Sequence, residues 1–236
     1  MAKYKEIASD LREKIKKGEY TYGQQLPKED ILCMKYGCNK ETMKKALALL
    51  VKEGLIIRRR GAGTFVKEFN PVQYNMSTLF TRGLTARYKG IKKVTSKIIV
   101  FEVIPSTSFL ANKLQIEEGT FVYHLIRLRY LDGIVHMIDE KYMPIEIIPQ
   151  LRKEDVEGSL YHYIENELKY KIQSSHINIT SKLSTIQEQD YLGLSEYEPY
   201  IQDEHISYLS TGQIFEYTIA RYPYNQFEFN AIIIAE

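Results

Sequence analysis

The sequence has 236 residues, of which 44% are hydrophobic and 26% charged, and its formal net charge at pH 7 is +2. These values predict a globular protein of one or two domains with a buried core. They exclude a membrane-spanning chain, because no apolar run is long enough, and the charged start MAKYKEIASDLREK is unlike a signal peptide. Cys33 and Cys38 fit no zinc or redox motif, and the histidines are scattered. We therefore expect a cytoplasmic protein with reduced thiols, no cofactor, no bound metal and no membrane partner.

The charge is divided unevenly along the chain. Residues 1–67 contain 16 Lys/Arg and 8 Asp/Glu, a net charge of +8, whereas residues 68–236 carry a net charge of −6. The small total therefore hides a basic N-terminal region joined to an acidic remainder. This division predicts that only the N-terminal region binds an anionic partner.

The N-terminal region predicts three helices in succession. The first carries apolar residues at helical spacing: Tyr4, Ile7, Ala8, Leu11 and Ile15. A second short helix is predicted between Pro27 and Gly37, and Asn39 can cap a third, which ends at Gly54. The third helix has an apolar face of Met43, Ala46, Leu47 and Leu50, and an opposite face of Lys40, Glu41, Lys44, Lys45 and Ala48. Taken alone, such a basic face indicates only a solvated surface.

The stretch GLIIRRRGAGTFV, residues 54–66, predicts a β-hairpin with a cationic tip. Leu55 and Ile57 are expected on one face of its first strand, and Arg58 and Arg60 on the other. The segment Gly61-Ala62-Gly63 can supply the positive φ angles of a tight turn. Three helices followed by a basic hairpin have the layout of a winged helix-turn-helix. In that motif the third helix enters the major groove and the wing contacts phosphates or the minor groove.

These residues resemble the DNA-binding domain of GntR-type bacterial transcription regulators. The matching positions are Tyr4, Ile7-Ala8, Leu11-Arg12, Ile15, Gly18, Gly23, Leu26-Pro27, Glu29, Thr42, Ala46-Leu47, Glu53 to Ile56 and Gly61 to Val66. The resemblance implies contact with double-stranded operator DNA through Lys28, Asn39, Lys40, Thr42, Lys44, Arg58, Arg60, Gly61, Gly63 and Thr64. The chain departs from the family at Lys28, Asp30, Asn39 and Lys40, where Ser, Arg, Ser and Arg are usual, and at Lys44, another common Arg position. Lysine lacks the bidentate fork of arginine, so an unusual operator is expected.

The remainder of the chain predicts a linker and a second domain. Residues 68–80 lack periodicity and contain Asn, Pro and Ser, as linkers do. Six strand-like runs follow from Lys92 onward, and the pairs Asp132-Gly133 and Thr211-Gly212 indicate hairpin turns. Helical segments are expected at about 106–114, 159–168 and 188–192. The pattern predicts an α+β domain on a largely antiparallel sheet.

Residues 80–234 resemble the UTRA effector domain of the HutC subgroup, whose fold is similar to chorismate lyase. The matching stretches are Arg127-Leu128-Arg129, Asp132-Gly133, Tyr142-Met143-Pro144, Gly158 to Tyr161, Tyr191 to Leu194, Phe215-Glu216-Tyr217 and Arg221-Tyr222. The resemblance implies a DNA-binding domain at 1–67, a linker at 68–80 and an effector-binding and dimerisation domain at 81–236. It is nearest to repressors of β-glucoside, glucomannan or trehalose uptake genes.

The resemblance also implies an effector site formed by Thr81, Arg82, Arg127, Arg129, Asp139, Ser159, Glu216 and Tyr222. Arg127 and Arg129 share a strand face, so they either form surface ion pairs or bind a phosphate or carboxylate in a pocket. Ser159 can cap the helix that follows it. Asp139 stands where the family usually has a ligand-binding glutamate, and it is one methylene shorter.

Two functions remain open from the residues. The first is a repressor of sugar-utilisation genes that binds operator DNA as a homodimer and is released by a phosphorylated sugar. The second is an enzyme acting on a small phosphorylated or carboxylated substrate in the chorismate-lyase-like domain. The basic N-terminal region favours the regulator, because an enzyme has no need of a winged helix, and no nucleophile with an adjacent base is discernible.

Overall fold

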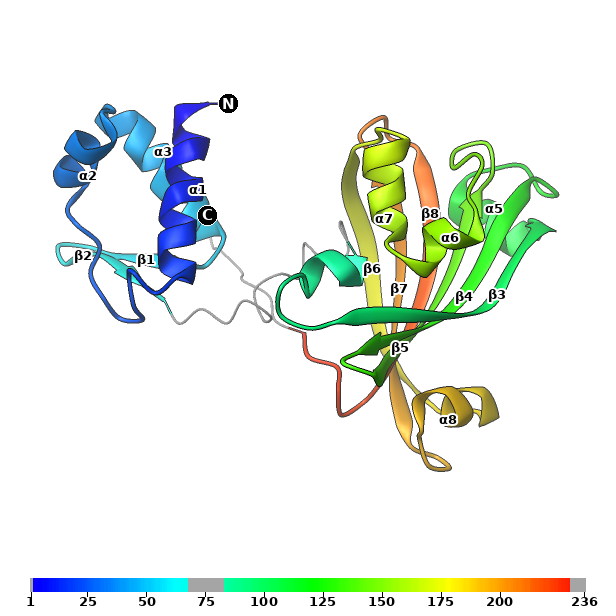
Figure 1. Ribbon diagram of the computed structural model, residues 1–236. Coiled ribbons are helices and arrows are strands. Elements are labelled where there is room, and N and C mark those ends of the chain that lie inside the picture. The colour runs from blue at the N-terminus through cyan, green and yellow to red at the C-terminus, as the bar shows by residue number, and fades with distance from the viewer. Residues whose placement is uncertain (1, 68–82, 230–236) are drawn as a thin grey trace. The chain divides into compact units, whose positions relative to one another are not determined.

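The computed structural model describes residues 2–67 and 83–229 and divides them into two compact units (Figure 1). Each unit is described by itself. The predicted linker at 68–80 and the predicted domain boundaries beside it lie outside the described residues and stay predictions. No helix in the described parts of the chain is long and apolar enough to cross a membrane.

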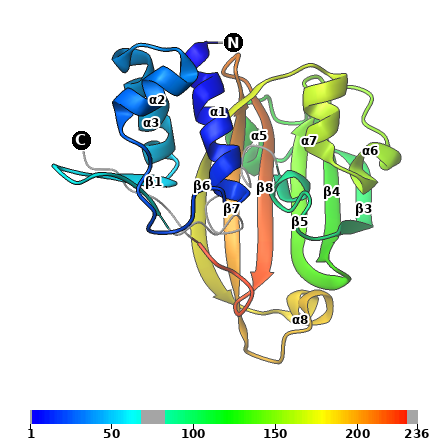
Figure 2. The same ribbon diagram turned by 60° about the vertical axis from the view of Figure 1, so that its left-hand side comes forward.

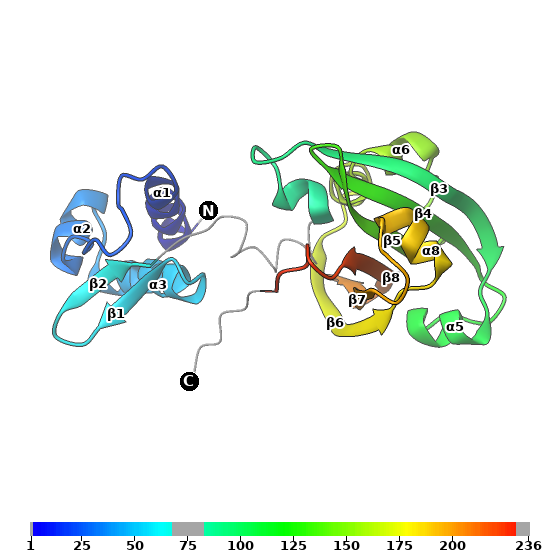
Figure 3. The same ribbon diagram turned by 90° about the horizontal axis from the view of Figure 1, so that it is seen from below.

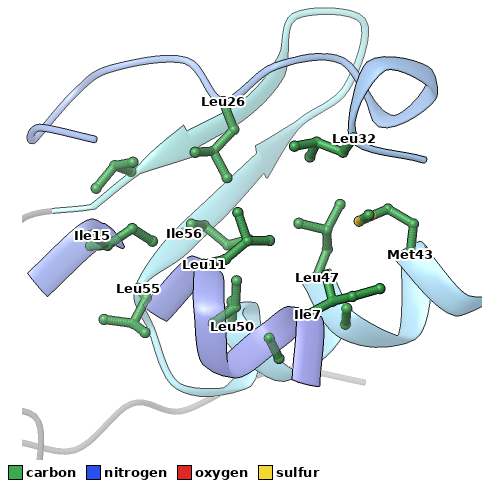
Figure 4. Packing of buried hydrophobic residues seen from close by; sticks show 13 residues of the cluster. Ile7, Leu11, Ile15, Leu26, Leu32, Met43, Leu47, Leu50, Leu55 and Ile56 are labelled. Carbon is green, nitrogen blue, oxygen red and sulfur yellow. The ribbon is translucent and has the colours of Figure 1, made fainter. Parts of the chain in front are cut away.

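The first unit contains three helices and a two-stranded sheet, in the predicted order. The elements are α1 (Lys3–Lys16), α2 (Glu29–Tyr36), α3 (Lys40–Lys52), β1 (Ile56–Arg59) and β2 (Gly63–Val66). One core joins them, shown in Figure 4, and its apolar residues come from every element: Ile7, Ala8, Leu11, Ile15, Leu26, Leu32, Met43, Ala46, Leu47, Leu50, Leu55, Ile56 and Val66. The buried stripe of α3 is the apolar face predicted from the sequence.

Capping residues fix where these helices begin and end. The Asn39 side chain accepts a hydrogen bond of 2.8 Å from the backbone N–H of Thr42, which satisfies one of the unpaired donors at the start of α3. Gly37 closes α2 in the left-handed conformation, with φ 56°. Gly37 therefore ends α2, and Asn39 begins α3 only two residues later.

The hairpin of β1 and β2 differs from the prediction in one respect. Its strand begins at Ile56, so the inward face carries Ile56, which is 1% exposed, while Ile57 is 42% exposed. The predicted placement of Ile57 beside Leu55 was wrong because Leu55 belongs to the turn before the strand, which shifts the alternation by one residue. Residues 23–26 extend this sheet, since the Leu26 N–H donates to the Thr64 carbonyl at 2.8 Å.

The second unit is built on a six-stranded antiparallel sheet of order β3-β4-β5-β8-β7-β6 (Figure 2). The strands are β3 (Val94–Pro105), β4 (Phe121–Leu131), β5 (Ile134–Pro144), β6 (Ile172–Leu183), β7 (Pro199–Leu209) and β8 (Ile214–Pro223). All six correspond to the strand-like runs of the sequence. Asp132 (φ 51°) and Gly133 (φ 86°) form the tight turn between β4 and β5, as predicted. The predicted α+β class is confirmed.

Helices cover both faces of the curved sheet (Figure 3). On one face α6 (Lys153–Glu157), α7 (Leu160–His162) and the π-helical turn η1 (Tyr163–Glu167) pack over β4, β5 and β8 through Leu160, Tyr161 and Ile164. On the other face lie α5 (Ser108–Leu114) and α8 (Ile186–Leu192). Helix α6 and a helical turn at residues 83–87 were not predicted. The first face also carries the buried polar residues described below.

Candidate DNA-contacting surface and effector cavity

Two lysines on the exposed face of α3 are each paired with a nearby carboxylate. Lys40 Nζ lies 2.8 Å from Asp30 Oδ1 at the start of α2, and Lys44 Nζ lies 3.4 Å from Glu41 Oε1. The hydrogen bond to Lys40 lowers the pKa of Asp30 below its usual value. The surface therefore presents closely spaced charges of both signs at the N-terminal ends of α2 and α3.

The three arginines of the hairpin have different surroundings. Arg58 forms an ion pair with Glu29 at 3.2 Å, and the Arg59 guanidinium lies 4.8 Å from the centre of the Phe65 ring. Arg60 forms no ion pair with any residue that the structure describes, and it stands at the tip of the turn. It is the arginine that could meet a phosphate without first leaving a partner.

The other predicted DNA-contacting residues fall on the same elements. Lys28 is the exposed N-cap of α2, and Thr42 is half-buried in the first turn of α3. Gly61 has φ 75° and Gly63 has φ 113°, conformations that a residue with a side chain rarely adopts. Thr64 begins the return strand after Gly63. Gln25 supports the turn, because its Nε2 donates to the Ala62 carbonyl at 2.7 Å.

The second unit contains a polar cavity between the sheet and the segment 83–85. Its floor comes from alternate residues of four strands: Arg127 and Arg129 on β4, Met137, Asp139 and Lys141 on β5, Asp203 and His205 on β7, and Ala220 and Tyr222 on β8. Its walls come from Gly83, Leu84, Thr85, Ser159, Leu160 and Tyr161. Side chains two positions apart on a strand point to the same face, which explains why each strand contributes residues at this spacing to the cavity.

The strand register aligns four cavity-lining residues in one row across the sheet. Arg127 lies opposite Asp139, and Asp139 and Asp203 both lie opposite Ala220. This row across the sheet therefore contains three charged side chains and one methyl group, and all four residues line the cavity. The space that a water-sized molecule can occupy is about 50 Å³.

Most of the buried charges in the cavity are paired. Arg127 donates to Asp139 at 2.5 Å and to the Val156 carbonyl at 2.6 Å. Lys141 Nζ donates to Glu216 at 3.0 Å and to Thr218 at 2.9 Å. Burial disfavours the Asp139 carboxylate, but the charges of Lys141, Arg127 and Arg129 outweigh burial and hold its pKa below the usual value. Asp139 is therefore ionised inside the cavity.

Arg129 is the exception. The residue is 3% exposed, and its only hydrogen bond in the described part of the chain runs from Nη2 to the Thr85 hydroxyl, at 2.8 Å. Its buried Nε has no hydrogen-bond partner there, and no carboxylate lies within ion-pair distance. Burial, followed by repulsion from Arg127, lowers the pKa of Arg129 to about 9. A buried guanidinium without a carboxylate is costly unless an anion joins it.

Asp203 and His205 form a second polar group on the floor. His205 Nδ1 lies 3.1 Å from Asp203 Oδ1, and its Nε2 lies 3.6 Å from Glu216 Oε1. Burial disfavours the imidazolium, but the nearby carboxylates of Asp203 and Glu216 outweigh burial and raise the pKa of His205 to about 9. The Tyr161 hydroxyl also donates to Glu216.

The structure brings together five of the eight predicted effector residues. Arg127, Arg129, Asp139, Ser159 and Tyr222 line the cavity. Glu216 is fully buried behind it and reaches it only through Lys141, Tyr161 and His205. Thr81 and Arg82 lie outside the described residues. The prediction missed Thr85, Lys141, Tyr161, Asp203 and His205. Alternation along β5 could have found Lys141, because it lies two residues after Asp139 and therefore on the same face.

A winged helix-turn-helix with lysines and arginines on its exposed surface, joined to a domain that encloses a polar cavity, is the architecture of a DNA-binding transcription regulator. Comparison with known families agrees with this class. Residues 3–66 match the gntR family of bacterial regulatory proteins, and residues 91–228 match the UTRA domain. The chain belongs to the GntR family of transcription regulators that carry a UTRA domain, and it is therefore not an enzyme.

Relatives cover the whole chain. It is 35% identical to the HTH-type transcriptional regulator GmuR of Bacillus subtilis (strain 168), over 99% of each chain. It is 32% identical to the mannosyl-D-glycerate transport/metabolism system repressor MngR of Escherichia coli (strain K12), over 99% of this chain and 95% of the relative. The crystal structure of the possible transcriptional regulator YydK of Bacillus subtilis matches with a TM-score of 0.81, at 30% identity over 100% of both chains.

Proposed function

We propose that this regulator represses genes for the uptake or breakdown of a sugar and leaves its operator when an anionic sugar, specifically a phosphorylated one, binds the cavity. The observation that carries the proposal is Arg129, a buried guanidinium that lines the cavity and has no carboxylate partner among the described residues. An anionic group of the ligand would supply the missing charge and accept hydrogen bonds from Nε and Nη2.

The relatives support a sugar as the remainder of the ligand. MngR is named for mannosyl-D-glycerate transport and metabolism, and other relatives are named as repressors of fructoselysine utilisation. Asp139 and Asp203 both line the cavity; the pKa of Asp139 is held low, and Asp203 is hydrogen-bonded to His205. Carboxylates accept hydrogen bonds from sugar hydroxyls. Thr81, Arg82 and Ser159 would add donors to the anion, as the family resemblance implies.

Ligand entry requires the cavity to open. The water-sized space of about 50 Å³ is far smaller than the roughly 300 Å³ or more of ordinary ligand pockets. The segment that closes it contains Thr85, which is the hydrogen-bond partner of Arg129. We propose that the ligand's anion competes with Thr85 for Arg129, so that binding displaces the residues that follow the predicted linker. This displacement would change the position of the linker and thereby affect the DNA-binding domain.

We also propose that the protein binds DNA as a homodimer through Lys40, Lys44 and Arg60. A single winged helix contacts only a few base pairs, so two copies on a palindromic operator are needed for useful specificity. Sedimentation with and without operator DNA tests this proposal. A monomer in both samples at micromolar concentration would contradict it.

The test of the effector is calorimetric titration with matched ligands. Trehalose 6-phosphate, other disaccharide phosphates, the unphosphorylated sugars and mannosylglycerate, which carries a carboxylate, are titrated into the full chain and its Arg129→Ala variant. We expect binding of a phosphorylated sugar and a loss of at least about tenfold in the variant, since charge-assisted hydrogen bonds each contribute ~1.5–3 kcal/mol. Arg152→Ala removes an exposed arginine outside the cavity lining and should bind as the wild type does. Equal binding of phosphorylated and unphosphorylated sugars would refute the proposal.

A further inference from the structure

Two carboxylates project from the surface that is proposed to bind DNA. The side chains of Asp30 and Glu41 are 68% and 74% exposed, and they lie at the N-terminal ends of α2 and α3. A carboxylate that faces a phosphate backbone is repelled. A carboxylate that faces the edge of a base can instead accept a hydrogen bond from the N4 amino group of cytosine.

The geometry of the Asp30–Lys40 pair distinguishes it from the Glu41–Lys44 pair. Asp30 and Lys40 belong to different helices, and their charged atoms lie 2.8 Å apart. They place one hydrogen-bond acceptor directly beside one donor. Glu41 and Lys44 are neighbours on one helix at 3.4 Å, which is a looser contact of the kind common on helix surfaces.

A G·C base pair presents the complementary pattern in the major groove. Guanine offers the O6 and N7 acceptors, and cytosine offers the N4 donor. O6 and N4 are joined by a hydrogen bond of about 2.9 Å within the base pair, so they are spaced like the charged atoms of Asp30 and Lys40. Lys40 lies in the first turn of α3, and a recognition helix contacts base edges with its N-terminal residues. Asp30 belongs to α2, but its carboxylate lies beside the Lys40 ammonium and therefore beside the same base edges.

We propose that the Asp30–Lys40 ion pair reads one G·C base pair in each operator half-site, with Lys40 donating to guanine and Asp30 accepting from the N4 of cytosine. This inference rests on the proposed DNA contact through α3. An A·T pair offers a donor and an acceptor in the same places, but thymine lacks the second acceptor that guanine N7 provides to the lysine and adds a methyl group. The pair therefore favours G·C, and Asp30 is a specificity-determining residue.

The experiment selects binding sites from random duplex DNA with three proteins: the wild type, Asp30→Ala and Glu41→Ala. The control variant Glu41→Ala removes the other exposed carboxylate of the same surface, so it matches the change in charge. Because both side chains are largely exposed, both variants should keep the wild-type thermal midpoint and circular dichroism. Affinities are then measured for the selected site and for the same site with the G·C pair replaced.

We expect the wild type to select a G·C pair at one position of each half-site, and to lose about tenfold in affinity when that pair is replaced. Asp30→Ala should lose the preference at this position alone, while Glu41→Ala keeps it. The inference is overturned if Asp30→Ala selects the same base pair as the wild type, or if the affected position is A·T. Selection of no sequence by any of the three proteins would instead contradict the proposed DNA contact itself.

Discussion

At the scale of single residues, burial of charge explains the chemistry of the cavity. Asp139, Lys141, Asp203 and His205 are each less than a tenth exposed, and each has a partner of opposite charge. Such networks are costly when one member is removed, because a buried charge is left unpaired. Arg129 is already such a buried charge, with no carboxylate partner among the described residues, before a ligand binds. This unpaired buried charge is the basis for proposing an anionic ligand.

His205 should make the stability of the protein depend on alkaline pH. Its pKa is raised to about 9 in the folded protein, against about 6.5 in an unfolded chain, because the nearby carboxylates of Asp203 and Glu216 outweigh burial. The stabilisation is fully present below pH 6.5 and is lost as the pH rises through about 9. Urea unfolding at pH 6 and pH 9.5 should show a decline that the His205→Gln variant lacks, on the order of 3 kcal/mol. Parallel declines in both proteins would refute the assignment.

Ala220 should control the size of the ligand site without affecting its charges. Ala220 lies between Asp139 and Asp203 in one row across the sheet, and it is the smallest side chain of that row in the cavity lining. The Ala220→Leu variant should place a larger side chain in the cavity and weaken binding of the effector by at least about tenfold. The same substitution should lower the free energy of unfolding by ~1–3 kcal/mol. Ala220→Ser keeps the volume and should bind normally. Calorimetry distinguishes the variants, and unchanged binding by Ala220→Leu would place the ligand elsewhere.

At the scale of elements, the hairpin of β1 and β2 is held in place by residues 23–26, which lie before α2 in the sequence. Residues 23–26 pair with β2, and Gln25 donates to the Ala62 carbonyl beside Gly63. A Cβ added at Gly63 would lie 2.3 Å from Gln25 Nε2. A side chain at position 63 would therefore displace the Gln25 amide, and the φ of 113° at Gly63 also favours glycine.

Two glycine variants test this packing. Gly63→Ala should destabilise the first unit more than Gly61→Ala does, because Gly61 also has a positive φ but nothing lies within 4 Å of an added Cβ. The backbone term alone is ~1–2 kcal/mol for either residue. Removing the Gln25 side chain in the Gly63→Ala background should recover part of the difference. Equal thermal midpoints for the two single variants would show that Gln25 does not restrict this position.

The sequence predicted the elements better than the site. Alternation and turn residues located all six strands of the sheet, and helical spacing located α1 and α3 with their buried faces. The misses have local causes: the short helix α6 has too few residues for a periodic pattern, and the face of Ile57 depended on a strand boundary. Lys141, Asp203 and His205 were missed because a polar residue on a strand is usually exposed. Only the closure of the sheet by helices and by residues 83–85 shows that this face is buried.

At the scale of the whole molecule, the proposed function requires that the cavity in one unit be coupled to the DNA-binding surface in the other. We propose that the hydrogen bond from Arg129 to Thr85 transmits ligand binding, because Thr85 follows the predicted linker closely in the sequence. A ligand changes the DNA equilibrium only through different affinities for the two states of the protein, typically by ~1–3 kcal/mol. Coupling of that size corresponds to a change of roughly 5-fold to 150-fold in operator affinity.

The coupling should be reciprocal and should depend on Thr85. An effector that weakens operator binding by a given factor must bind the operator complex more weakly by the same factor. In Thr85→Val, Arg129 loses the hydroxyl that competes with the ligand's anion, so we expect tighter effector binding and a smaller effect on DNA. Operator affinity without effector should match the wild type, because residue 85 lies outside the DNA-binding unit. Operator titrations with and without saturating effector, for wild type, Thr85→Val and Arg129→Ala, measure each quantity. Undiminished coupling in Thr85→Val would show that the signal leaves the cavity by another route.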